Sequence, residues 1–371
     1  MKMESSNVYV LSNYMKEFTP ARLRNFRRDL AGWYQANQRD LPWRRTTEPY
    51  RIWISEIMLQ QTRVAAVIPY YERFLARFPD VAALAAATDD DLLNSWAGLG
   101  YYSRARNLRT AARQVVTAGH FPETYDDILQ LPGIGPYTAA AVASICFGAP
   151  HAVLDGNVIR VLTRLTNDSE DIWSLRTKNR LQQVAQILLD PGNPAVHNQA
   201  VMELGATICV PREPRCKLCP IISYCEASSK GLERELPVKL RRSEIRRSRR
   251  KLLVVIRNGN ILLWQRAQDA ALLGGFWELP ELHQLPEAKS VRLLKEFSHA
   301  ITNHIYDFRV VSARVSRVPS PLLWMPLEQL PVLPLSTVTR KALLYAQLPR
   351  NAPTGGVEWE DGKSCELLIR K

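Results

Sequence analysis

Four cysteines constrain this chain more than any other feature. Cys209, Cys216, Cys219 and Cys225 follow the spacing C-x6-C-x2-C-x5-C within seventeen residues. Soft thiolates gathered so closely bind metal, and four of them suit either tetrahedral zinc or an iron–sulfur cluster. Structural zinc usually takes its ligands from two C-x2-C pairs a dozen or more residues apart, but here only Cys216 and Cys219 form such a pair. The spacing therefore favours an iron–sulfur cluster, with zinc and unliganded or disulfide-bonded thiols as the alternatives.

Length and charge favour an intracellular protein with a polyanionic partner. The 371 residues suffice for two or three domains, each with its own core. The net charge of +13 is typical of nucleic-acid binding, although many basic proteins bind nothing specific. No segment has the length and apolarity of a membrane span or the pattern of a secretory leader. Because thiolate-bound metal requires a reducing compartment, we expect a cytoplasmic location, at the nucleoid in a bacterium.

Apolar residues at spacings of three and four predict an almost entirely helical region over residues 20–228. The clearest helices are expected at Ala21–Gln38, Tyr50–Gln61, Val64–Phe78, Asp89–Trp96, Ser103–Ala118, Asp126–Leu131, Tyr137–Phe147, Asn157–Leu165 and Lys178–Leu189. Cys146 falls in one of them and is expected to be a core residue.

The composition changes after this region. Residues 239–251 carry eight basic residues and one acid, which indicates an exposed linker that is either simply solvated or contacts DNA phosphates or a partner. Two apolar runs, 251–257 and 261–266, flank an Asn-Gly-Asn turn and predict a β-hairpin. A helix around Ser290–Phe297, strands near Ile305–Arg317 and a helix at Leu335–Ala346 complete a predicted α+β domain. A loosely ordered tail, containing Cys365, is expected at 351–371.

Two glycine-containing turns indicate contact with nucleic acid. In Leu131–Tyr137 (LPGIGPY), Gly133 and Gly135 allow a tight turn that presents backbone N–H groups at a helix start, which suits a phosphate. An ordinary helix–helix turn is the alternative. Downstream, VLDGN contains Asp155 and Asn157 at the start of another helix. Together with the cysteines, these segments resemble the helix–hairpin–helix and Gly/Pro/Asp motif of the endonuclease III and MutY family of base-excision DNA glycosylases.

The resemblance implies a multidomain protein: an all-α helix–hairpin–helix glycosylase region at 20–228, then an α+β Nudix-like domain at 251–350. Within the first region it implies a six-helix barrel at about 41–150 and a cluster domain at about 20–40 plus 151–228, with a basic linker at 229–250. It also implies that the four cysteines hold a [4Fe–4S] cluster. The partner would be double-stranded DNA containing adenine opposite 8-oxoguanine or guanine, bound by a monomer.

Cleaving a purine N-glycosidic bond requires an acid for the leaving base and a carboxylate for the sugar cation. Asp155 suits the second role, although aspartate is also an ordinary helix N-cap. Glu56 lies among Ile52, Trp53 and Ile57, where apolar surroundings raise the pKa of a carboxyl, unless it is a surface glutamate on an amphipathic helix. Because both segments resemble the MutY sequence, the resemblance assigns Glu56 as the proton donor to adenine N7 and Asp155 as the stabilising carboxylate.

Tyr137 distinguishes the two branches of the family. Glycosylases that also cleave the strand carry a lysine at the matching position, whose amine forms a Schiff base with the sugar, and a phenol cannot do this. The resemblance therefore implies a monofunctional adenine glycosylase. Tyr137 is expected to orient the carboxyl pair and Asn157 to support Asp155, unless both are merely structural.

Further residues match family positions that contact DNA. Arg44, in LPWR, and Gln199 match the adenine pocket, while Gln61 and Tyr101 match positions that wedge into the duplex or stack on the opposite base. Thr62 and Leu99 are expected to touch the opposing base. For each of these, ordinary loop or core packing is the alternative.

The C-terminal domain contains LGGFWELP at 273–280, which resembles the start of the Nudix signature. The acidic helix that holds metal in Nudix hydrolases is missing, so pyrophosphatase activity is not expected. Phe297, Ser298 and His299 match the loop with which MutY senses 8-oxoguanine. The competing interpretations are an endonuclease III-like lyase, a glycosylase specific for another mismatch, and a damaged-DNA binder without catalytic activity.

Overall fold

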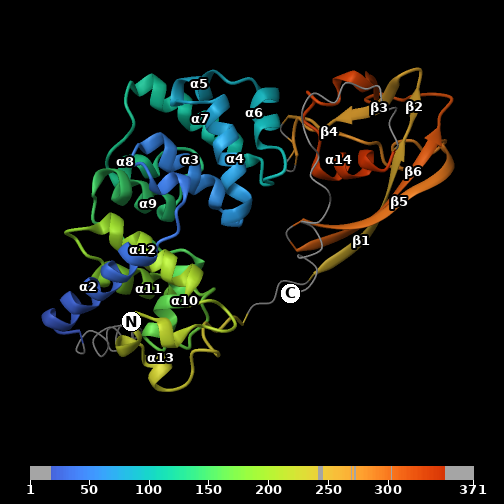
Figure 1. Ribbon diagram of the computed structural model, residues 1–371. Helices are drawn as coiled ribbons and strands as arrows, with labels where there is room; N and C mark the ends of the chain where they lie inside the picture. Colours follow the sequence, from blue (N-terminus) through green and yellow to red (C-terminus); the bar gives the residue numbers. More distant parts are fainter. Residues whose placement is uncertain (1–17, 241–244, 269, 271–272, 302, 347–371) are drawn as a thin grey trace, which may run out of the picture. The chain divides into compact units, whose positions relative to one another are not determined.

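The computed structural model describes residues 18–240, 245–268, 270, 273–301 and 303–346. The chain divides into two compact units (Figure 1). The first comprises Met1–Ala87 and Ser103–Ser243, and the second comprises Thr88–Tyr102 and Glu244–Lys371. The tail predicted at 351–371, with Cys365, lies outside the described residues.

The first unit is helical, as predicted. Its helices are α2 (Pro20–Asn37), η1 (Pro42–Arg44), α3 (Pro49–Leu59), α4 (Val64–Arg77), α5 (Val81–Ala86), α7 (Ser103–Ala118), α8 (Tyr125–Leu129), α9 (Pro136–Phe147), α10 (Gly156–Leu165), α11 (Leu175–Leu188), α12 (Pro194–Thr207), η2 (Cys216–Leu218), η3 (Ile222–Tyr224) and α13 (Glu226–Ser229). Proline occupies the first turn of α2, α3, α9 and α12, where its missing N–H costs no hydrogen bond. Within the residues described, no helix is long and apolar enough to cross a membrane.

Helices distant in sequence pack together in this unit and position the candidate site. Helix α3 packs against α4 and α9, and α12 packs against α2, α9 and α10 (Figure 1). The core beneath α12 joins apolar residues of α2, such as Phe26 and Leu30, to those of α10 and α11. As a result, the start of α9, the start of α10 and one face of α12 meet near α3.

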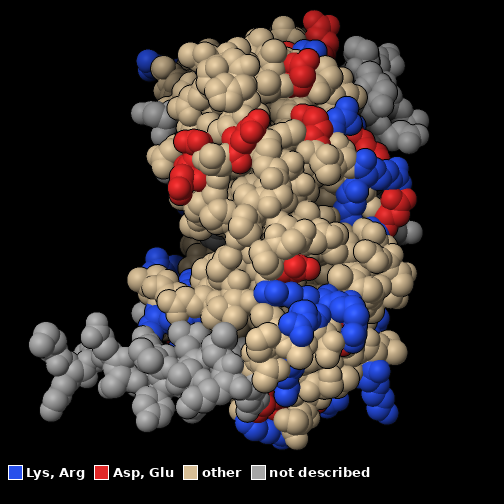
Figure 2. Space-filling model, turned by 90° about the vertical axis from the view of Figure 1, so that its left-hand side faces the viewer, with Lys and Arg blue, Asp and Glu red and all other residues tan. Residues whose placement is uncertain are grey.

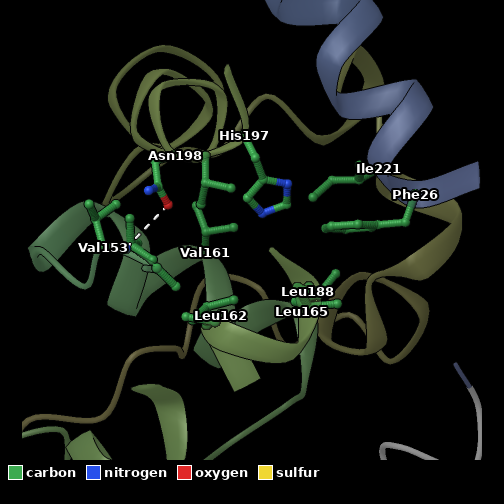
Figure 3. A pocket seen from close by; sticks show the side chains of 13 residues that line it. Phe26, Val153, Val161, Leu162, Leu165, Leu188, His197, Asn198 and Ile221 are labelled. Carbon is green, nitrogen blue, oxygen red and sulfur yellow. Dashed lines mark hydrogen bonds between the residues drawn. The ribbon is translucent and has the colours of Figure 1, made fainter. Parts of the chain in front are cut away.

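A small cavity of about 20 Å³ lies inside this core (Figure 3). Phe26, Val161 and Ile221 line it, and the His197 ring points into it. Burial lowers the pKa of His197 to about 4, so the ring is neutral at physiological pH. The surroundings are those of a core histidine.

The second unit is α+β, as predicted. It contains α6 (Asp89–Trp96), β1 (Arg246–Val254), β2 (Ile256–Arg257), β3 (Asn260–Gln265), β4 (Trp277–Glu278), β5 (Lys289–Ile301), β6 (His304–Arg314), β7 (Leu323–Pro326), η4 (Leu327–Gln329) and α14 (Thr337–Leu344). One sheet has the order β1-β6-β5, with β1 parallel to β6, and the other joins β2, β3, β4 and β7. The segment that contains α6 belongs to this unit, where the Tyr102 ring lies 4.2 Å from the Phe276 ring.

The predicted hairpin is present. Strands β2 and β3 are antiparallel, and Asn258 and Gly259 between them have φ of 50° and 73°. This is the left-handed pair that a two-residue hairpin turn requires.

The helix predicted around Ser290–Phe297 is wrong. These residues belong to β5, which pairs with β6 from Lys289↔Arg314 to Ile301↔His304, with two register shifts between Ser290 and Lys295. Strand β1 also begins at Arg246, inside the basic run that was expected to be a linker. In both segments, pairing with β6 determines the backbone rather than the local pattern of side chains.

Candidate active site

Glu56 is a buried carboxyl on α3. The helix starts at Pro49, where the Glu48 side chain accepts hydrogen bonds from the backbone N–H groups of Tyr50 and Arg51. Glu56 is only 5% exposed and lies among the fully or nearly fully buried Trp53 and Ile57. Burial raises the pKa of Glu56 to about 7, and the nearby Asp155 carboxylate adds to this effect. Near neutral pH this carboxyl can therefore carry a proton and release it.

Tyr137 contacts Glu56 directly. It stands in the first turn of α9, and its hydroxyl donates to Glu56 Oε2 at 2.8 Å. The same hydroxyl lies 3.2 Å from Met202 Sδ on α12. A phenol has one proton, so it can donate to only one of these acceptors at a time. Because burial and the neighbouring carboxyls raise the pKa of Tyr137 well above its usual range, the phenol stays neutral.

Asp155 caps α10 and is also available to the site. Its Oδ1 accepts from Val158 N at 2.7 Å, and its Oδ2 accepts from Asn157 Nδ2 at 2.8 Å. The capping role and a catalytic role are therefore compatible. Burial raises the pKa of Asp155 above its usual value, but the two donated hydrogen bonds oppose this effect. The two carboxyls thus lie in different environments, because Asp155 accepts hydrogen bonds from Val158 N and Asn157 whereas Glu56 accepts one from Tyr137.

Asn157 connects this carboxylate to the cysteine segment. Its Oδ1 accepts from Arg160 Nη2 at 2.9 Å, while Arg160 Nε donates to the Cys209 carbonyl at 2.8 Å. Glycine is required at Gly205 on the facing helix α12, since a Cβ there would lie 2.7 Å from Asn157 Cβ. This close approach holds Asn157 in place beside Asp155.

Arg44 forms another wall of the site, together with residues that the sequence analysis did not identify. Its Nη2 donates to Glu203 Oε2 at 2.8 Å, and its guanidinium lies over the Tyr34 ring. The Tyr34 hydroxyl donates to Gln199 Oε1 at 3.1 Å. The structure thus brings Arg44 and Gln199 together through Tyr34, and adds Glu203 to them.

The segment after α3 is held by a buried arginine. Arg104 Nη1 donates to the carbonyls of Ile57 and Gln60, at 2.7 Å and 2.6 Å. The next residue, Gln61, is exposed and has a φ of 57°, which is uncommon for a residue other than glycine. Thr62 follows, and its hydroxyl donates to the Gln60 carbonyl. Gln61 thus occupies a well-defined protruding turn.

The glycines of the predicted phosphate turn differ in their requirements. Gly133 has a φ of 80°, and a Cβ there would lie 2.6 Å from Asn107 Cβ, so only glycine fits. Gly135 is the N-cap residue of α9 with a φ of −103°, and a Cβ there would meet no atom within 4 Å. The open space at Gly135 leaves room for a ligand at this helix start.

Two predicted base contacts lie in the second unit beside α6. Tyr101 is 41% exposed and has a φ of 49°. Leu99, by contrast, is only 7% exposed. The structure thus exposes Tyr101 and buries most of Leu99.

The four predicted metal ligands lie in one segment of the first unit, around η2 and η3. None of them forms a disulfide among the described residues. Burial raises the pKa of the Cys219 thiol to about 12, and the other three thiols add to this effect through space, so all four lie within electrostatic reach of one another. The buried Arg164 guanidinium donates to Cys209 Sγ at 3.2 Å. Over the described part of the chain, however, no three His, Cys, Asp or Glu side chains are arranged to hold a metal ion.

Phe297, Ser298 and His299, which were expected in a loop, instead lie consecutively on strand β5, paired with β6. Side chains alternate along a strand, so Ser298 faces the side of the sheet opposite to its two neighbours. Its hydroxyl donates to Asp307 Oδ1 at 2.6 Å, and Arg247 binds the same carboxylate with two hydrogen bonds. Burial lowers the pKa of His299 to about 4, so this ring is neutral.

The surface charge is uneven. On the face shown in Figure 2, lysine and arginine gather on the lower half, at the height of α2, α10 and α13, whereas acidic side chains lie mainly on the upper half. The lower half is therefore the more favourable side for a polyanion.

Comparison with known proteins identifies relatives of this chain. Residues 54–187 match the model of the HhH-GPD superfamily base excision DNA repair proteins. The mouse adenine DNA glycosylase is 35% identical over 395 residues, covering 85% of this chain and 76% of the mouse protein. The rat adenine DNA glycosylase is 47% identical over 213 residues, covering 54% of this chain, but this match spans only 41% of the rat protein. A solved structure of a thermostable thymine-DNA glycosylase is 29% identical, with a TM-score of 0.51 over 56% of this chain and 97% of that one.

Proposed function

Because the chain belongs to the adenine DNA glycosylase family, we propose that it is a monofunctional glycosylase removing adenine paired with 8-oxoguanine or guanine in duplex DNA. The observation that carries the proposal is the meeting of a protonatable, buried Glu56 with Tyr137, near the hydrogen-bonded Asp155. These groups suit a reaction that protonates a leaving base and stabilises a sugar cation.

In the proposed reaction, Glu56 donates its proton to adenine N7. The C1′–N9 bond then breaks and its electron pair leaves with the base, so that adenine departs without a net negative charge. The positive charge that develops on the sugar lies opposite the ionised Asp155. Water adds to C1′ and gives its proton to a carboxylate of the pair, leaving an abasic site.

Tyr137 argues against cleavage of the DNA strand by this site. The neutral phenol donates a hydrogen bond to Glu56 and cannot form a Schiff base with the sugar. We therefore propose that the abasic strand stays intact after the base leaves.

The adenine would lie against Arg44 and Gln199. A guanidinium only donates hydrogen bonds, so it suits the ring nitrogens of a purine, while an amide can both donate and accept. Gln61 and Tyr101 would fill or stack in the opened duplex, with Thr62 and Leu99 near the opposing base. The turn containing Gly133 and Gly135 would hold a DNA phosphate.

Recognition of 8-oxoguanine is assigned to Phe297, Ser298 and His299. Arg247 and Ser298 lower the pKa of Asp307 to about 2, so this carboxylate is ionised and accepts a hydrogen bond from the Ser298 hydroxyl. The free lone pairs of the Ser298 hydroxyl can then accept a hydrogen bond, and 8-oxoguanine has an N7–H donor that guanine lacks. The direction of this hydrogen bond therefore supports preference for the oxidised base.

We also propose that Cys209, Cys216, Cys219 and Cys225 hold a [4Fe–4S] cluster. Three observations support this donor set: the four thiols form no disulfide among the described residues, the other three act on the pKa of Cys219, and Arg164 donates to Cys209 Sγ. When bound, the cluster would fix the fold of this segment, which carries Arg212, Arg215 and Lys217 as phosphate contacts.

The test is single-turnover incubation with duplexes containing A:8-oxoguanine, A:G and T:G, each analysed with and without alkali. The proposal predicts release from the two adenine duplexes only, with strand breaks appearing only after alkali. Breaks without alkali would indicate a lyase, release from T:G would indicate another specificity, and binding without release would indicate a DNA binder without catalytic activity.

A further inference from the structure

Glu203 is a completely buried carboxylate beside the site. It lies on α12 and is 0% exposed. Its Oε1 accepts from Arg39 N at 3.1 Å and from Arg39 Nε at 2.7 Å. Its Oε2 accepts from Arg39 Nη2 at 2.7 Å and from Arg44 Nη2 at 2.8 Å. One negative charge thus lies between two guanidinium groups.

These contacts fix the Arg44 side chain. The side chain is only 11% exposed, and besides Glu203 it donates through Nη1 to the Arg39 carbonyl at 3.1 Å. Its guanidinium lies 5.4 Å from the centre of the Tyr34 ring. Arg39, in contrast, is 38% exposed and more accessible to water. Glu203 therefore holds the better-buried guanidinium in one orientation.

The charge of Arg44 also reaches Glu56. The titratable or charged groups that act on Glu56 are Tyr137 from α9, Asp155 from the start of α10 and Arg44 from η1, and the Cys146 thiol of α9 also interacts with it electrostatically. The Arg44 cation lowers the pKa of Glu56, against the effects of burial and Asp155. A carboxylate bound to Arg44 opposes this influence, since it offsets part of the positive charge.

We infer that Glu203 is a positioning residue of the adenine pocket, which holds the Arg44 guanidinium in place and offsets its charge beside Glu56. This inference rests on the proposed function, because it assigns Glu56 as the acid and Arg44 as a pocket residue. The alternative is an ion pair that merely joins α12 to the segment between α2 and η1. The two differ in their effect on the pH dependence of excision.

The test is the single-turnover rate of adenine release by the cluster-loaded, full-length enzyme between pH 5 and 9. The wild-type rate should fall at high pH as Glu56 ionises. In Glu203→Gln the size is kept but the charge is lost, so the fall should begin about 0.5–1 pH unit lower and reduce the rate about three- to tenfold at pH 8. Asp168→Asn is the matched control, since it removes a buried carboxylate paired with Arg180 outside the site. This control should keep the wild-type pH profile despite a loss of stability.

Arg39→Met is a second variant, which should shift the pH dependence of excision in the opposite direction. It tests the inference if Glu203→Gln does not fold. It leaves Glu203 to Arg44 alone, so the fall in rate should move to higher pH. Wild-type profiles in the folded variants, or shifts of both variants in the same direction, would overturn the inference. A wild-type enzyme that releases no adenine would instead refute the proposed function.

Discussion

Replacing Glu56 with glutamine should stop excision and, at alkaline pH, stabilise the protein. Burial raises the pKa of Glu56 from 4.5 to about 7, so folding favours the protonated carboxyl. The stability associated with this group is fully present below about pH 4.5 and is lost as the pH rises through about 7. Glutamine has nearly the same shape and never ionises, so its advantage should grow with pH.

The expected size follows from the two pKa values. Since the pKa of Glu56 rises from 4.5 to about 7 on folding, the free energy of unfolding that wild type loses and the variant keeps is about 3 kcal/mol at pH 8.5. At pH 5 this difference is only about 1 kcal/mol. For a unit of this size, these free energies correspond to an increase in Tm of about 6–12 °C at pH 8.5 and about 2–4 °C at pH 5. Excision should fall by at least ~10²-fold at every pH, since an amide cannot deliver a proton.

The assay is thermal unfolding of wild type and Glu56→Gln across this pH range, beside single-turnover excision. Glu203→Gln is the contrasting variant, because its two arginine partners lower the pKa of Glu203 to about 2. Its carboxylate stabilises the fold above about pH 4.5, so this variant should be less stable than wild type at both pH values. A Glu56→Gln variant that is destabilised at pH 8.5, or equally stabilised at both pH values, would refute the assigned burial and pKa.

Three further predictions concern the other parts of the proposal. Asp155→Asn should lower excision at least ~10²-fold while duplex binding survives, because the amide keeps the helix cap but loses the charge opposite the sugar cation; near-normal turnover would contradict the assignment. Cys219→Ser should remove the brown colour of the purified protein and weaken DNA binding more than excision from bound DNA, whereas stoichiometric zinc in wild-type protein would rule out the iron–sulfur cluster. Ser298→Ala should reduce the preference for A:8-oxoguanine over A:G by about 5- to 150-fold while A:G excision persists. An unchanged ratio of the two excision rates would mean that Ser298 does not recognise 8-oxoguanine.

The sequence was most informative where local chemistry determines local structure. Asn258 and Gly259 predict the hairpin because few residues adopt positive φ, and both do so here. The apolar neighbours of Glu56 correctly predict its burial, since they form the inward face of α3. Asp155 is a cap by residue type, and Val158 N donates to it.

Strand β5 could not be predicted in the same way. The spacing of Leu293, Leu294 and Phe297 suits a helix, and most of the strand is exposed, so half-buried and exposed residues alternate only over its last part, from Phe297 to Ile301. Only pairing with β6 makes it a strand. Long-range hydrogen bonding thus overrides local preference here.

Glu203 and Met202 were missed for a related reason. Helix α12 buries residues on several sides, including His197, Asn198 and Glu203, and therefore lacks the periodicity of an amphipathic helix. The partners of Glu203 lie 159 and 164 residues away in the sequence. The available signal was an acid within an apolar segment, since such a group must find a cation elsewhere in the fold.

The central claim is that Glu56 protonates adenine at N7, and replacing that one atom in the substrate tests it most directly. A duplex with 7-deazaadenine opposite 8-oxoguanine keeps the shape and pairing edge of adenine but has a carbon where the proton would go. The measurement is binding and single-turnover excision by wild-type enzyme on this duplex and on its adenine counterpart. The proposed mechanism predicts that the analogue binds comparably and is not excised, and excision of 7-deazaadenine at a rate near that of adenine would contradict it.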